Sequence, residues 1–281
     1  MSLNAGLYEI KSVMPFSVLM SIYIKDNAEH FELALKSIDD SMCKPSEVCI
    51  VCDGPLTLQQ EDILDKYSNI LPLNILRLEN NVGLGLALNK GMSICSNEII
   101  SRFDSDDICF LTRFEEQYDA ITSHNLDIVG SWVSEFDVEL NEPHAIRKVP
   151  QNHYDIVGYA KYRNPFNHMS VMFKKTSVIS AGGYKNEYLY EDYALWVRMI
   201  MNGARCANIQ KVLVGARTGN GMERRRGGLK YAKAEFKAQY YFYNEGFIPL
   251  WQLINNIILR LPIRVLPGKV RKFIYRKILR K

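Results

Sequence analysis

The stretch EIISRFDSDD, residues 98–107, places an acidic turn directly after a short apolar strand. Two carboxylates in alternate positions, those of Asp104 and Asp106, can share one hard divalent cation. Mg²⁺ or Mn²⁺ bound in this way bridges to diphosphate oxygens and neutralises the charge that develops on a departing nucleotide diphosphate. Acidic turns also occur without a metal, and it is the position after a buried strand that favours a metal site here.

The residues before this stretch alternate between strand and helix patterns. Apolar runs typical of buried strands occupy residues 16–24, 47–52, 73–78 and 98–103, with helical spacing between them, for example at 28–41. Strands separated by single helices form right-handed βαβ units and a mostly parallel sheet with helices on its faces. We therefore predict an α/β fold whose ligand site lies beyond the carboxyl ends of the strands.

Two more polar turns follow predicted strands and should meet the acidic turn at the same edge of the sheet. Asp53 ends the second strand, either as a turn residue or as an acceptor for a base N–H or a ribose hydroxyl. Residues 80–83 (NNVG) end the third strand and lead into NVGLGLALNKG, residues 81–91. This segment lacks the spacing of a dinucleotide fingerprint. Its small residues either let the backbone approach a ligand or serve packing alone.

The less regular second half, which suggests an acceptor-binding portion, contains further candidate site residues. Glu191 and Asp192 open a helical pattern, where carboxylates interact favourably with the helix dipole. The alternative role is a general base that takes the proton from an attacking acceptor hydroxyl. His168 precedes a strand-like segment at residues 170–173, and it either contacts phosphate or acceptor or caps that strand.

A basic, glycine-rich stretch follows in the same half. It reads RTGNGMERRRGG, residues 217–228, and contains Arg217, Arg224 and Arg225. Such a loop can close over phosphates and exclude water. A solvated basic loop is the competing interpretation.

The last residues of the chain are strongly basic. Residues 246–281 hold nine Lys or Arg and no Asp or Glu, so residues 1–245 carry −5, the difference between the total of +4 and +9. An apolar helical stripe at residues 250–261 should be broken by Pro262 and Pro267, and residues 269–281 form a second, basic amphipathic helix. Each Lys or Arg near an anionic membrane surface contributes about 1 kcal/mol. We expect residues 269–281 to face the membrane. Residues 250–261 either pack on the domain or also associate with the membrane.

Nothing in the sequence predicts a segment that crosses a membrane. The longest uncharged run, residues 246–259, has 14 residues, whereas about 20 are needed to span a bilayer. The first apolar stretch, residues 13–24, contains Pro15 and lacks a basic leader. We expect a cytoplasmic protein that is peripheral on the inner face of the cell membrane. Its domains should be a catalytic domain at 1–245, divided into halves at about 14–108 and 109–245, and a tail at 246–281.

The six cysteines do not predict a metal site. Cys49 and Cys52 form a CxxC inside a predicted strand, where side chains three residues apart point to opposite faces. No second CxxC or CxxH is present to complete a zinc site. Buried, reduced thiols are the expected state.

Six stretches of the chain, taken together, resemble the family 2 glycosyltransferases, which are inverting enzymes with the GT-A fold. They occur in the family's order: SVLMSIYIKD (17–26), VCIVCDGP (48–55), NNVGLGLALNKGM (80–92), IISRFDSDDI (99–108), NPFNHMSVMF (164–173) and GGYKNEYLYEDYALWVRM (182–199).

The resemblance implies a role for each matching residue. The catalytic base is Asp192, beside Glu191, and the metal ligands are Asp104 and Asp106. The residues of the nucleotide-sugar site are Ser21, Tyr23, Asp53, Gly83, Asn89, Arg102, Asp104, Ser105 and Asp106.

The resemblance also implies the substrates. It indicates a UDP-sugar donor, Mn²⁺ or Mg²⁺, and an acceptor sugar carried on a lipid diphosphate at an anionic membrane surface. The chain looks most like bacterial β-1,3-galactosyl- or glucosyltransferases that extend an N-acetylhexosamine primer on undecaprenyl diphosphate for O-antigen or exopolysaccharide. Galactose is favoured and glucose comes next, with GlcNAc, GalNAc and rhamnose as alternatives.

Other protein classes fit the residues less well. A haloacid-dehalogenase-type phosphatase also uses Asp-x-Asp after a strand, but Thr or Val follows where this chain has Asp107. A sugar nucleotidyltransferase needs a glycine-rich loop after the first strand, and residues 25–31 (KDNAEHF) contain no glycine. A non-catalytic membrane-surface adaptor would carry the basic tail without needing the carboxylates. The basic residues of the tail are interspersed with aliphatic residues, which favours lipid over nucleic acid as its partner.

Overall fold

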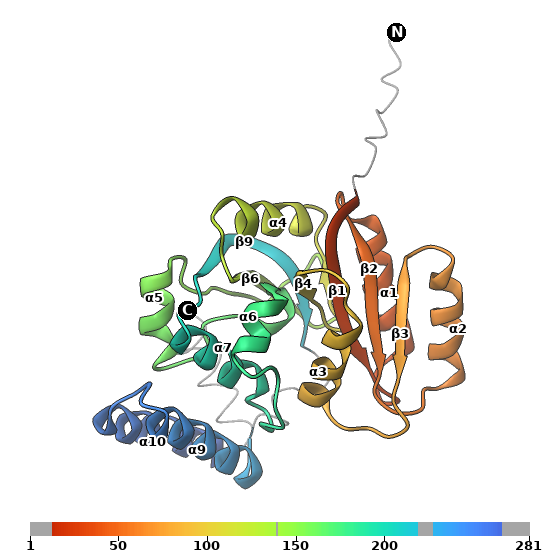
Figure 1. Ribbon diagram of the computed structural model, residues 1–281. Coiled ribbons are helices and arrows are strands. Elements are labelled where there is room, and N and C mark those ends of the chain that lie inside the picture. The colour runs from red at the N-terminus through yellow and green to blue at the C-terminus, as the bar shows by residue number, and fades with distance from the viewer. Residues whose placement is uncertain (1–12, 139, 219–226, 266–281) are drawn as a thin grey trace.

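The computed structural model describes residues 13–138, 140–218 and 227–265, and one mixed sheet forms its centre (Figure 1). Within these residues the strand order is β3-β2-β1-β4-β8-β6-β9-β5, and β7 pairs with β6. The strands are β1 (Val13–Ile22), β2 (Lys44–Cys52), β3 (Leu73–Arg77), β4 (Ile99–Arg102), β5 (Ile108–Cys109), β6 (Ile128–Phe136), β7 (Ala145–Arg147), β8 (Met172–Lys174) and β9 (Cys206–Arg217).

The helices lie on both sides of this sheet and below its second half (Figure 1). They are α1 (Ala28–Asp40), α2 (Leu58–Ser68), α3 (Leu84–Ile94), α4 (Arg113–Ser123), α5 (His153–Ala160), the 3₁₀ helix η1 (His168–Ser170), α6 (Lys175–Ser180), α7 (Glu191–Met201), α9 (Leu229–Asn244) and α10 (Leu250–Val265).

The two halves of the chain contribute differently to the sheet. Strands β3, β2, β1 and β4 are all parallel, as the alternating pattern predicts. The second half adds antiparallel pairs through β8, β7 and β5, with β6 and β9 parallel to each other. The α/β prediction is confirmed, and both halves share one continuous sheet.

Alternation along the strands explains how the sheet is covered on both faces. In β1, Val18 and Met20 pack into the core with α1 and α2, whereas Leu19 packs on the other face with α3 and α7. In β2, Cys52 and Cys49 point to these same two opposite sides. The CxxC therefore cannot chelate a metal, as predicted, and all six cysteines are buried outside any disulfide.

Local signals explain where the first helices begin. The side chain of Asn27 accepts from the backbone N–H of His30 and caps α1. Thr57 and Gln60 form a reciprocal capping box at the start of α2. These caps satisfy backbone donors that a helix N-terminus otherwise leaves unpaired.

The expectation that Pro262 breaks the C-terminal helical stripe is wrong. Helix α10 continues through Pro262 to its end at Val265. A proline ring removes one helical hydrogen bond, but tertiary contacts can compensate. Here Arg264 supplies them, because its guanidinium binds the Glu235 carboxylate and its carbonyl accepts from the N–H of Gly228 at 2.8 Å. The predicted basic helix at 269–281 lies outside the described residues.

Helix length sets a limit on membrane crossing. Among the residues that the structure describes, no helix combines the length and the apolar composition required to span a bilayer.

Two helical glycines make a test of the packing between sheet and helix. A Cβ on Gly91 in α3 would lie 2.6 Å from both Leu19 Cδ1 and Val51 Cγ2, whereas a Cβ on Gly158 in α5 meets nothing within 4 Å. Gly91→Ala should therefore lower the free energy of unfolding by about 1–3 kcal/mol through overpacking. Gly158→Ala should raise it by about 0.5–1 kcal/mol, because alanine favours the helix. Urea denaturation of the two variants checks the opposite signs; a stabilised Gly91→Ala contradicts the packing.

Candidate active site

Three carboxylates meet in the turn between β4 and β5. One oxygen each of Asp104, Asp106 and Asp107 lies within 4.8 Å of the others. The sequence predicts the first two as metal ligands, and the structure adds Asp107. One oxygen of Asp107 accepts the backbone N–H of Arg217 at 2.9 Å, while its other oxygen is buried and has no hydrogen-bond partner among the described residues. The cluster thus has the oxygen donors that a hard divalent cation prefers.

The charges of this turn perturb one another. Burial raises the pKa of Asp106 to about 7, and the neighbouring carboxylates of Asp104 and Asp26 add to the rise. Burial, followed by Asp104 and Asp106, raises the pKa of Asp107 well above its usual range. Like charges held together in a buried site favour a bound cation or a proton, so the cluster fits a divalent metal.

Arg102, at the end of β4, is a buried cation beside the acidic turn. Its Nη2 lies 2.5 Å from Asp104 Oδ1, and its backbone carbonyl accepts from Arg113 Nη2 at 2.7 Å. Burial lowers the pKa of this guanidinium, but Asp104 overcomes that effect and the net shift is upward. The Nε and Nη1 groups of Arg102 are buried without a hydrogen-bond partner in the described part of the chain.

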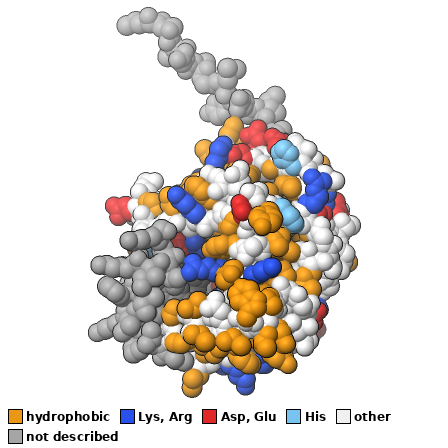
Figure 2. All heavy atoms as spheres, turned by 90° about the vertical axis from the view of Figure 1, so that its left-hand side faces the viewer, with side chains coloured by type: hydrophobic (Ala, Val, Ile, Leu, Met, Phe, Trp, Pro, Cys, Tyr) orange, Lys and Arg blue, Asp and Glu red, His pale blue; other side chains and the backbone are white. Residues whose placement is uncertain are grey.

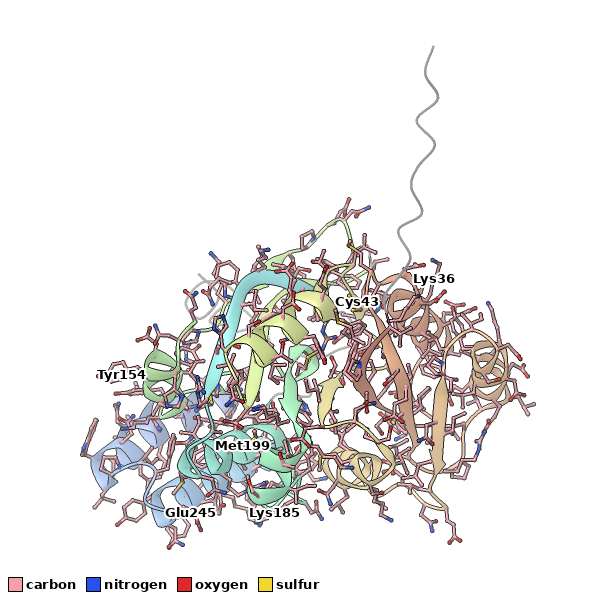
Figure 3. All side chains as sticks on the ribbon, turned by 45° about the horizontal axis from the view of Figure 1, so that its top comes forward. Lys36, Cys43, Tyr154, Lys185, Met199 and Glu245 are labelled. Carbon is pink, nitrogen blue, oxygen red and sulfur yellow. The ribbon has the colours of Figure 1, made fainter. Side chains whose placement is uncertain are left out.

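Asp53 organises the loop that begins α3. Its two carboxylate oxygens accept the backbone N–H groups of Val82 and Gly83, at 2.7 and 3.0 Å. Both roles considered for Asp53 remain compatible, because each oxygen has a second lone pair. Gly83 adopts φ +88° and a Cβ there meets nothing within 4 Å, whereas one on Gly85 would lie 2.7 Å from the carbonyl of Lys185. Lys185 is in the loop that precedes α7 (Figure 3). Conformation therefore explains the first glycine, and packing explains the second.

The remaining predicted nucleotide-site residues lie around these loops. Ser21 is half-buried near the end of β1, on the same face as Leu19. Ser105 donates to Asp26 Oδ2 at 2.9 Å, and the backbone N–H of Tyr23 donates to the same oxygen at 3.2 Å. Asn89 is exposed on α3, beside Gly183.

Glu191 and Asp192 form the first turn of α7, as predicted. Asn164 Nδ2 donates to Asp192 Oδ2 at 2.6 Å, and the N–H of Tyr193 donates to Asp192 Oδ1 at 2.7 Å. Burial raises the pKa of Asp192, and these two hydrogen bonds oppose the rise. Burial, with Asp192 next, raises the pKa of Glu191 to about 7. Asp192 is thus the carboxylate whose charged form is better supported.

His168 lies at the start of η1 and does not cap β8. Its Nε2 lies 3.0 Å from the hydroxyl of Tyr184, and its ring packs edge-on against Trp196. Burial, reinforced by Arg102, holds the pKa of His168 well below its usual range, so the ring is neutral at physiological pH. His168 is thus a neutral, buried ring that interacts with Arg102 and packs against Tyr184 and Trp196.

Arg217 ends β9 and is held against the acidic turn. Its Nε donates to the carbonyl of Asp106 at 3.2 Å, and its guanidinium lies 4.7 Å from the ring centroid of Phe136. Arg217 therefore supports the acidic turn. Arg224 and Arg225 lie outside the described residues.

The acidic turn and the start of α7 face the same guanidinium. The charge of Arg102 opposes the rise in the pKa of Asp106 and Asp107 in the acidic turn. It also opposes the rise in the pKa of Glu191 and Asp192 in α7. The arrangement brings the carboxylates of the acidic turn and those of Glu191 and Asp192 around one guanidinium.

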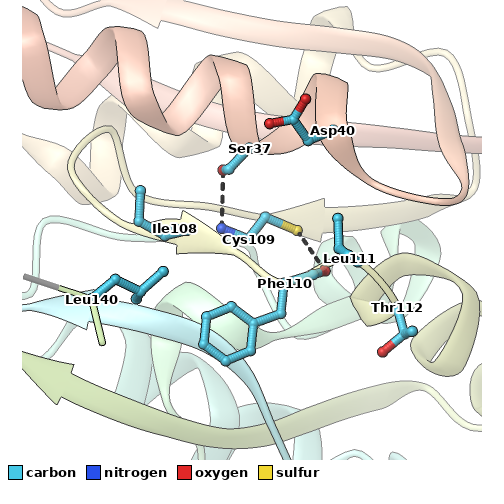
Figure 4. A pocket seen from close by; sticks show the side chains of 8 residues that line it. All are labelled: Ser37, Asp40, Ile108, Cys109, Phe110, Leu111, Thr112 and Leu140. Atoms are coloured by element: carbon cyan, nitrogen blue, oxygen red, sulfur yellow. Dashed lines mark hydrogen bonds between the residues drawn. The ribbon is translucent and has the colours of Figure 1, made fainter. Parts of the chain in front are cut away.

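A separate pocket lies beside β5 (Figure 4). It is mainly apolar, with Cys109, Phe110, Leu111 and Leu140 in its lining. Its carboxylate, Asp40, pairs with Lys36 at 2.5 Å on the surface of α1. It lacks the converging acidic groups of the β4–β5 turn.

Sequence reasoning missed two residues that the structure places in the site. Asp26 follows β1 as Asp53 follows β2, so the rule of strand ends could have found it. Asn164 begins the NPFNH motif, in which only His168 was singled out. Its contact with Asp192 spans 28 residues of chain, and no local pattern signals it.

The comparison with protein families decides the class. The family model described as Glycosyl transferase family 2 matches residues 17–181. The chain belongs to this glycosyltransferase family. A UDP-Gal:alpha-D-GlcNAc-diphosphoundecaprenol beta-1,3-galactosyltransferase of Escherichia coli is 44% identical over 95% of this chain and 97% of that protein. The amylovoran biosynthesis glycosyltransferase AmsE of Erwinia amylovora is 38% identical over 93% and 98%.

Solved structures confirm the GT-A-type fold of this glycosyltransferase. S. aureus TarS 1–349 in complex with UDP-GlcNAc superposes with a TM-score of 0.64 at 19% identity, over 82% of this chain and 67% of that one. The mannosyltransferase PcManGT from Pyrobaculum calidifontis, in complex with GDP-Man and Mn²⁺, has a TM-score of 0.64 at 15% identity, over 97% and 80%. At this identity the likeness concerns the fold.

The raised pKa of Asp106 predicts how stability and metal binding depend on pH. Because its pKa moves from 3.8 to about 7, the stability that it contributes is complete below the unfolded value and is lost as the pH rises through about 7. The melting temperature of metal-free protein should therefore be lower at about pH 8 than at about pH 6, and Mn²⁺ should raise it mainly at the higher pH.

Differential scanning fluorimetry with and without Mn²⁺ measures both effects. Asp106→Asn should weaken both effects, with Asp107 and Glu191 still titrating, whereas Asp119→Asn, on the exposed side of α4, should keep them in full. An equal Mn²⁺ response in the Asp106→Asn variant would remove Asp106 from the cation site.

Proposed function

We propose that this chain transfers galactose from UDP-galactose, in β-1,3 linkage, to N-acetylhexosamine-diphospho-undecaprenol during the assembly of O-antigen or a related surface polysaccharide. The chemistry rests on one observation, the acidic turn and Asp192 placed around Arg102. The choice of substrates rests on the E. coli galactosyltransferase, which is 44% identical over nearly the full length of both chains. Glucose is the next candidate donor sugar.

In this proposal Asp192 is the general base. Its carboxylate takes the proton from the acceptor hydroxyl while that oxygen forms a bond to the anomeric carbon. The bond from this carbon to the diphosphate oxygen breaks, UDP leaves with the electron pair, and the configuration inverts. Asn164 holds one oxygen of Asp192 at 2.6 Å and leaves its other lone pairs for the acceptor.

Asp104, Asp106 and Asp107 would hold the divalent cation, Mn²⁺ or Mg²⁺. When bound, such a cation neutralises negative charge on the diphosphate of the leaving group. Arg102 fixes Asp104 from below, and Asp53 shapes the loop at Gly83 beside which the nucleotide is expected to bind. Ser21 and Tyr23 are proposed to line the base and ribose pocket.

The proposed acceptor places the enzyme at the inner face of the cell membrane. Undecaprenyl diphosphate is confined to the bilayer, so its head group is presented at the surface. The seven Lys and Arg of residues 266–281, with no Asp or Glu among them, favour an anionic surface. We propose a peripheral attachment through this tail.

A donor panel tests the function. Purified enzyme with Mn²⁺ and a synthetic GlcNAc- or GalNAc-diphospho-lipid should transfer sugar from UDP-Gal and not from UDP-GlcNAc or UDP-GalNAc, and EDTA should abolish transfer. Asp192→Asn should lower kcat by at least about 10²-fold, the size of a general-base contribution, while leaving the affinity for UDP unchanged. Transfer of another sugar would correct the donor. A large loss of UDP affinity in Asp192→Asn would contradict the role of the base.

Removal of the Asn164 amide should move the pH profile of the reaction. This hydrogen bond favours the charged form of Asp192, so Asn164→Ala should raise the pKa of Asp192 and shift the acidic limb of kcat to higher pH, by about one unit. Arg102, Arg147 and Glu191 also face this carboxylate and stay in place. The pH dependence of kcat in both proteins measures the shift. A uniform loss across the whole range would indicate a purely structural role for Asn164.

A further inference from the structure

Helices α9 and α10 pack against each other through a polar seam. Glu235 is fully buried there, and its carboxylate pairs with Arg260 Nη2 at 3.0 Å and Arg264 Nη2 at 2.9 Å. Asn256 Nδ2 donates to Gln239 Oε1 at 2.7 Å. These contacts pair the buried carboxylate with two guanidinium groups, while Gln239 Nε2 is buried without a hydrogen-bond partner among the described residues.

The opposite side of α10 is apolar and exposed. Leu250, Trp251, Ile254, Ile258 and Leu259 keep 53%, 63%, 49%, 64% and 59% of their surface accessible. Figure 2, which faces the side of the molecule where α10 lies, shows hydrophobic side chains gathered over its lower part. A helix on a water-soluble surface normally shows the reverse pattern, with its apolar stripe toward the core and its polar stripe in water.

The exposed side of α9 combines aromatic and basic residues. Phe236 and Tyr240 are half exposed and stack with ring centroids 6.2 Å apart. Lys230, Lys233 and Lys237 lie exposed on the same side of the helix. Aromatic rings and long basic side chains are the residues that proteins place at the boundary between acyl chains and head groups.

The apolar face continues into a basic segment of the chain. Residues 266–281, which follow α10 directly, contain seven Lys or Arg and no Asp or Glu. This sequence complements an anionic surface, whereas a second copy of the same chain would bring its own basic segment against it. Charge therefore favours anionic lipid as the partner of this face.

We propose that the outer face of the α9–α10 pair inserts into one leaflet of an anionic bilayer, with α10 lying in the plane of the interface. We call this face, made of Phe236, Tyr240, Leu250, Trp251, Ile254, Ile258 and Leu259, the insertion face. The apolar side chains of α10 enter the acyl region, and the lysines of α9 contact lipid phosphates. The inference rests on the proposed function in one respect, since the lipid-linked acceptor is the reason for the enzyme to bind a membrane.

The insertion face is rigidly linked to the start of the catalytic helix. The hydroxyl of Tyr190 donates to Glu235, and Tyr190 directly precedes Glu191 and Asp192. Asn256 Nδ2 also donates to the carbonyl of Lys161 at 2.8 Å, three residues before Asn164. Insertion thus holds the proposed base at a fixed height above the head groups, where a diphosphate-linked sugar is presented.

Sedimentation of the full-length chain with vesicles tests the insertion face. The probe is phosphatidylcholine with phosphatidylglycerol, at low and at high salt. At low salt each Lys or Arg of the basic segment should strengthen vesicle binding about fivefold. High salt should screen this electrostatic contribution and leave the apolar contribution. At high salt the double variant Trp251→Glu, Ile258→Glu should bind at least about tenfold more weakly than wild type, because two large side chains lose their apolar burial.

A matched control and a fluorescence readout complete the test. Leu58→Glu changes a side chain that is 84% exposed on α2 and should bind vesicles like wild type. Lipids brominated in the acyl chain should quench the fluorescence of wild type much more than that of Trp251→Phe. Equal binding of the double variant and wild type at high salt, or equal quenching of wild type and Trp251→Phe, would overturn the proposal.

Two further measurements separate this inference from other outcomes. In analytical ultracentrifugation without lipid, wild type and the double variant should have the same oligomeric state. If wild type self-associates and the double variant does not, the face joins two copies and the proposal is wrong. Transfer to a short-chain, water-soluble acceptor should be equal in wild type and the double variant, while transfer to acceptor in vesicles falls in the variant. If neither protein transfers sugar to any acceptor, the proposed function fails, and the vesicle results still decide the insertion face.

Discussion

The ion pair between Arg102 and Asp104 is the constraint on which the site depends. A guanidinium this deeply buried is tolerated only when opposite charges compensate for its lost hydration. Asp104 supplies the direct contact at 2.5 Å, and the carboxyls of Asp107, Glu191 and Asp192 add to the favourable field. Because β4 fixes the backbone of Arg102 between β1 and β8, the acidic turn and the first turn of α7 are held on two sides of one charge. The geometry that brings the acidic turn and Asp192 together thus begins in the sheet.

The sequence was sufficient for the parts of the site that strand ends determine. Parallel strands deliver the residues that follow them to one edge, so Asp53, the 80–83 turn and the acidic turn could be predicted to lie together. Alternation in β2 also predicted correctly that Cys49 and Cys52 point apart. Glu191 and Asp192 were predicted as the first turn of a helix, and only the structure shows which of the two carries the supporting hydrogen bonds.

Contacts between distant segments lay beyond the sequence. Asn164 reaches Asp192 because η1 and α7 pack around Trp196, and no spacing in the chain records this. Pro262 was expected to end a helix, since a proline removes a helical hydrogen bond, but Arg264 and Glu235 stabilise the following turn. The polarity of α10 is the third case. One alternative for its stripe was an apolar side packed on the domain, whereas partners on α9 for Asn256 and the two arginines turn the polar side inward, and Gln252 donates to Asn256 within α10.

The charge balance of the site argues for a cation in the working enzyme. Six carboxyl groups converge on a region whose buried guanidinium groups include those of Arg102 and Arg113, and they belong to Asp26, Asp104, Asp106, Asp107, Glu191 and Asp192. The guanidinium of Arg217 lies close by, but it binds the carbonyl of Asp106 and the ring of Phe136. Such an excess of carboxylates resolves in one of two ways, by protonation or by a bound cation. Protonation would leave the acidic turn without a cation. Its carboxyl groups would then offer no positive charge to bind a diphosphate. A divalent cation would neutralise the acidic turn and attract a diphosphate, and Asp192, with its two hydrogen bonds, would remain a carboxylate able to accept a proton.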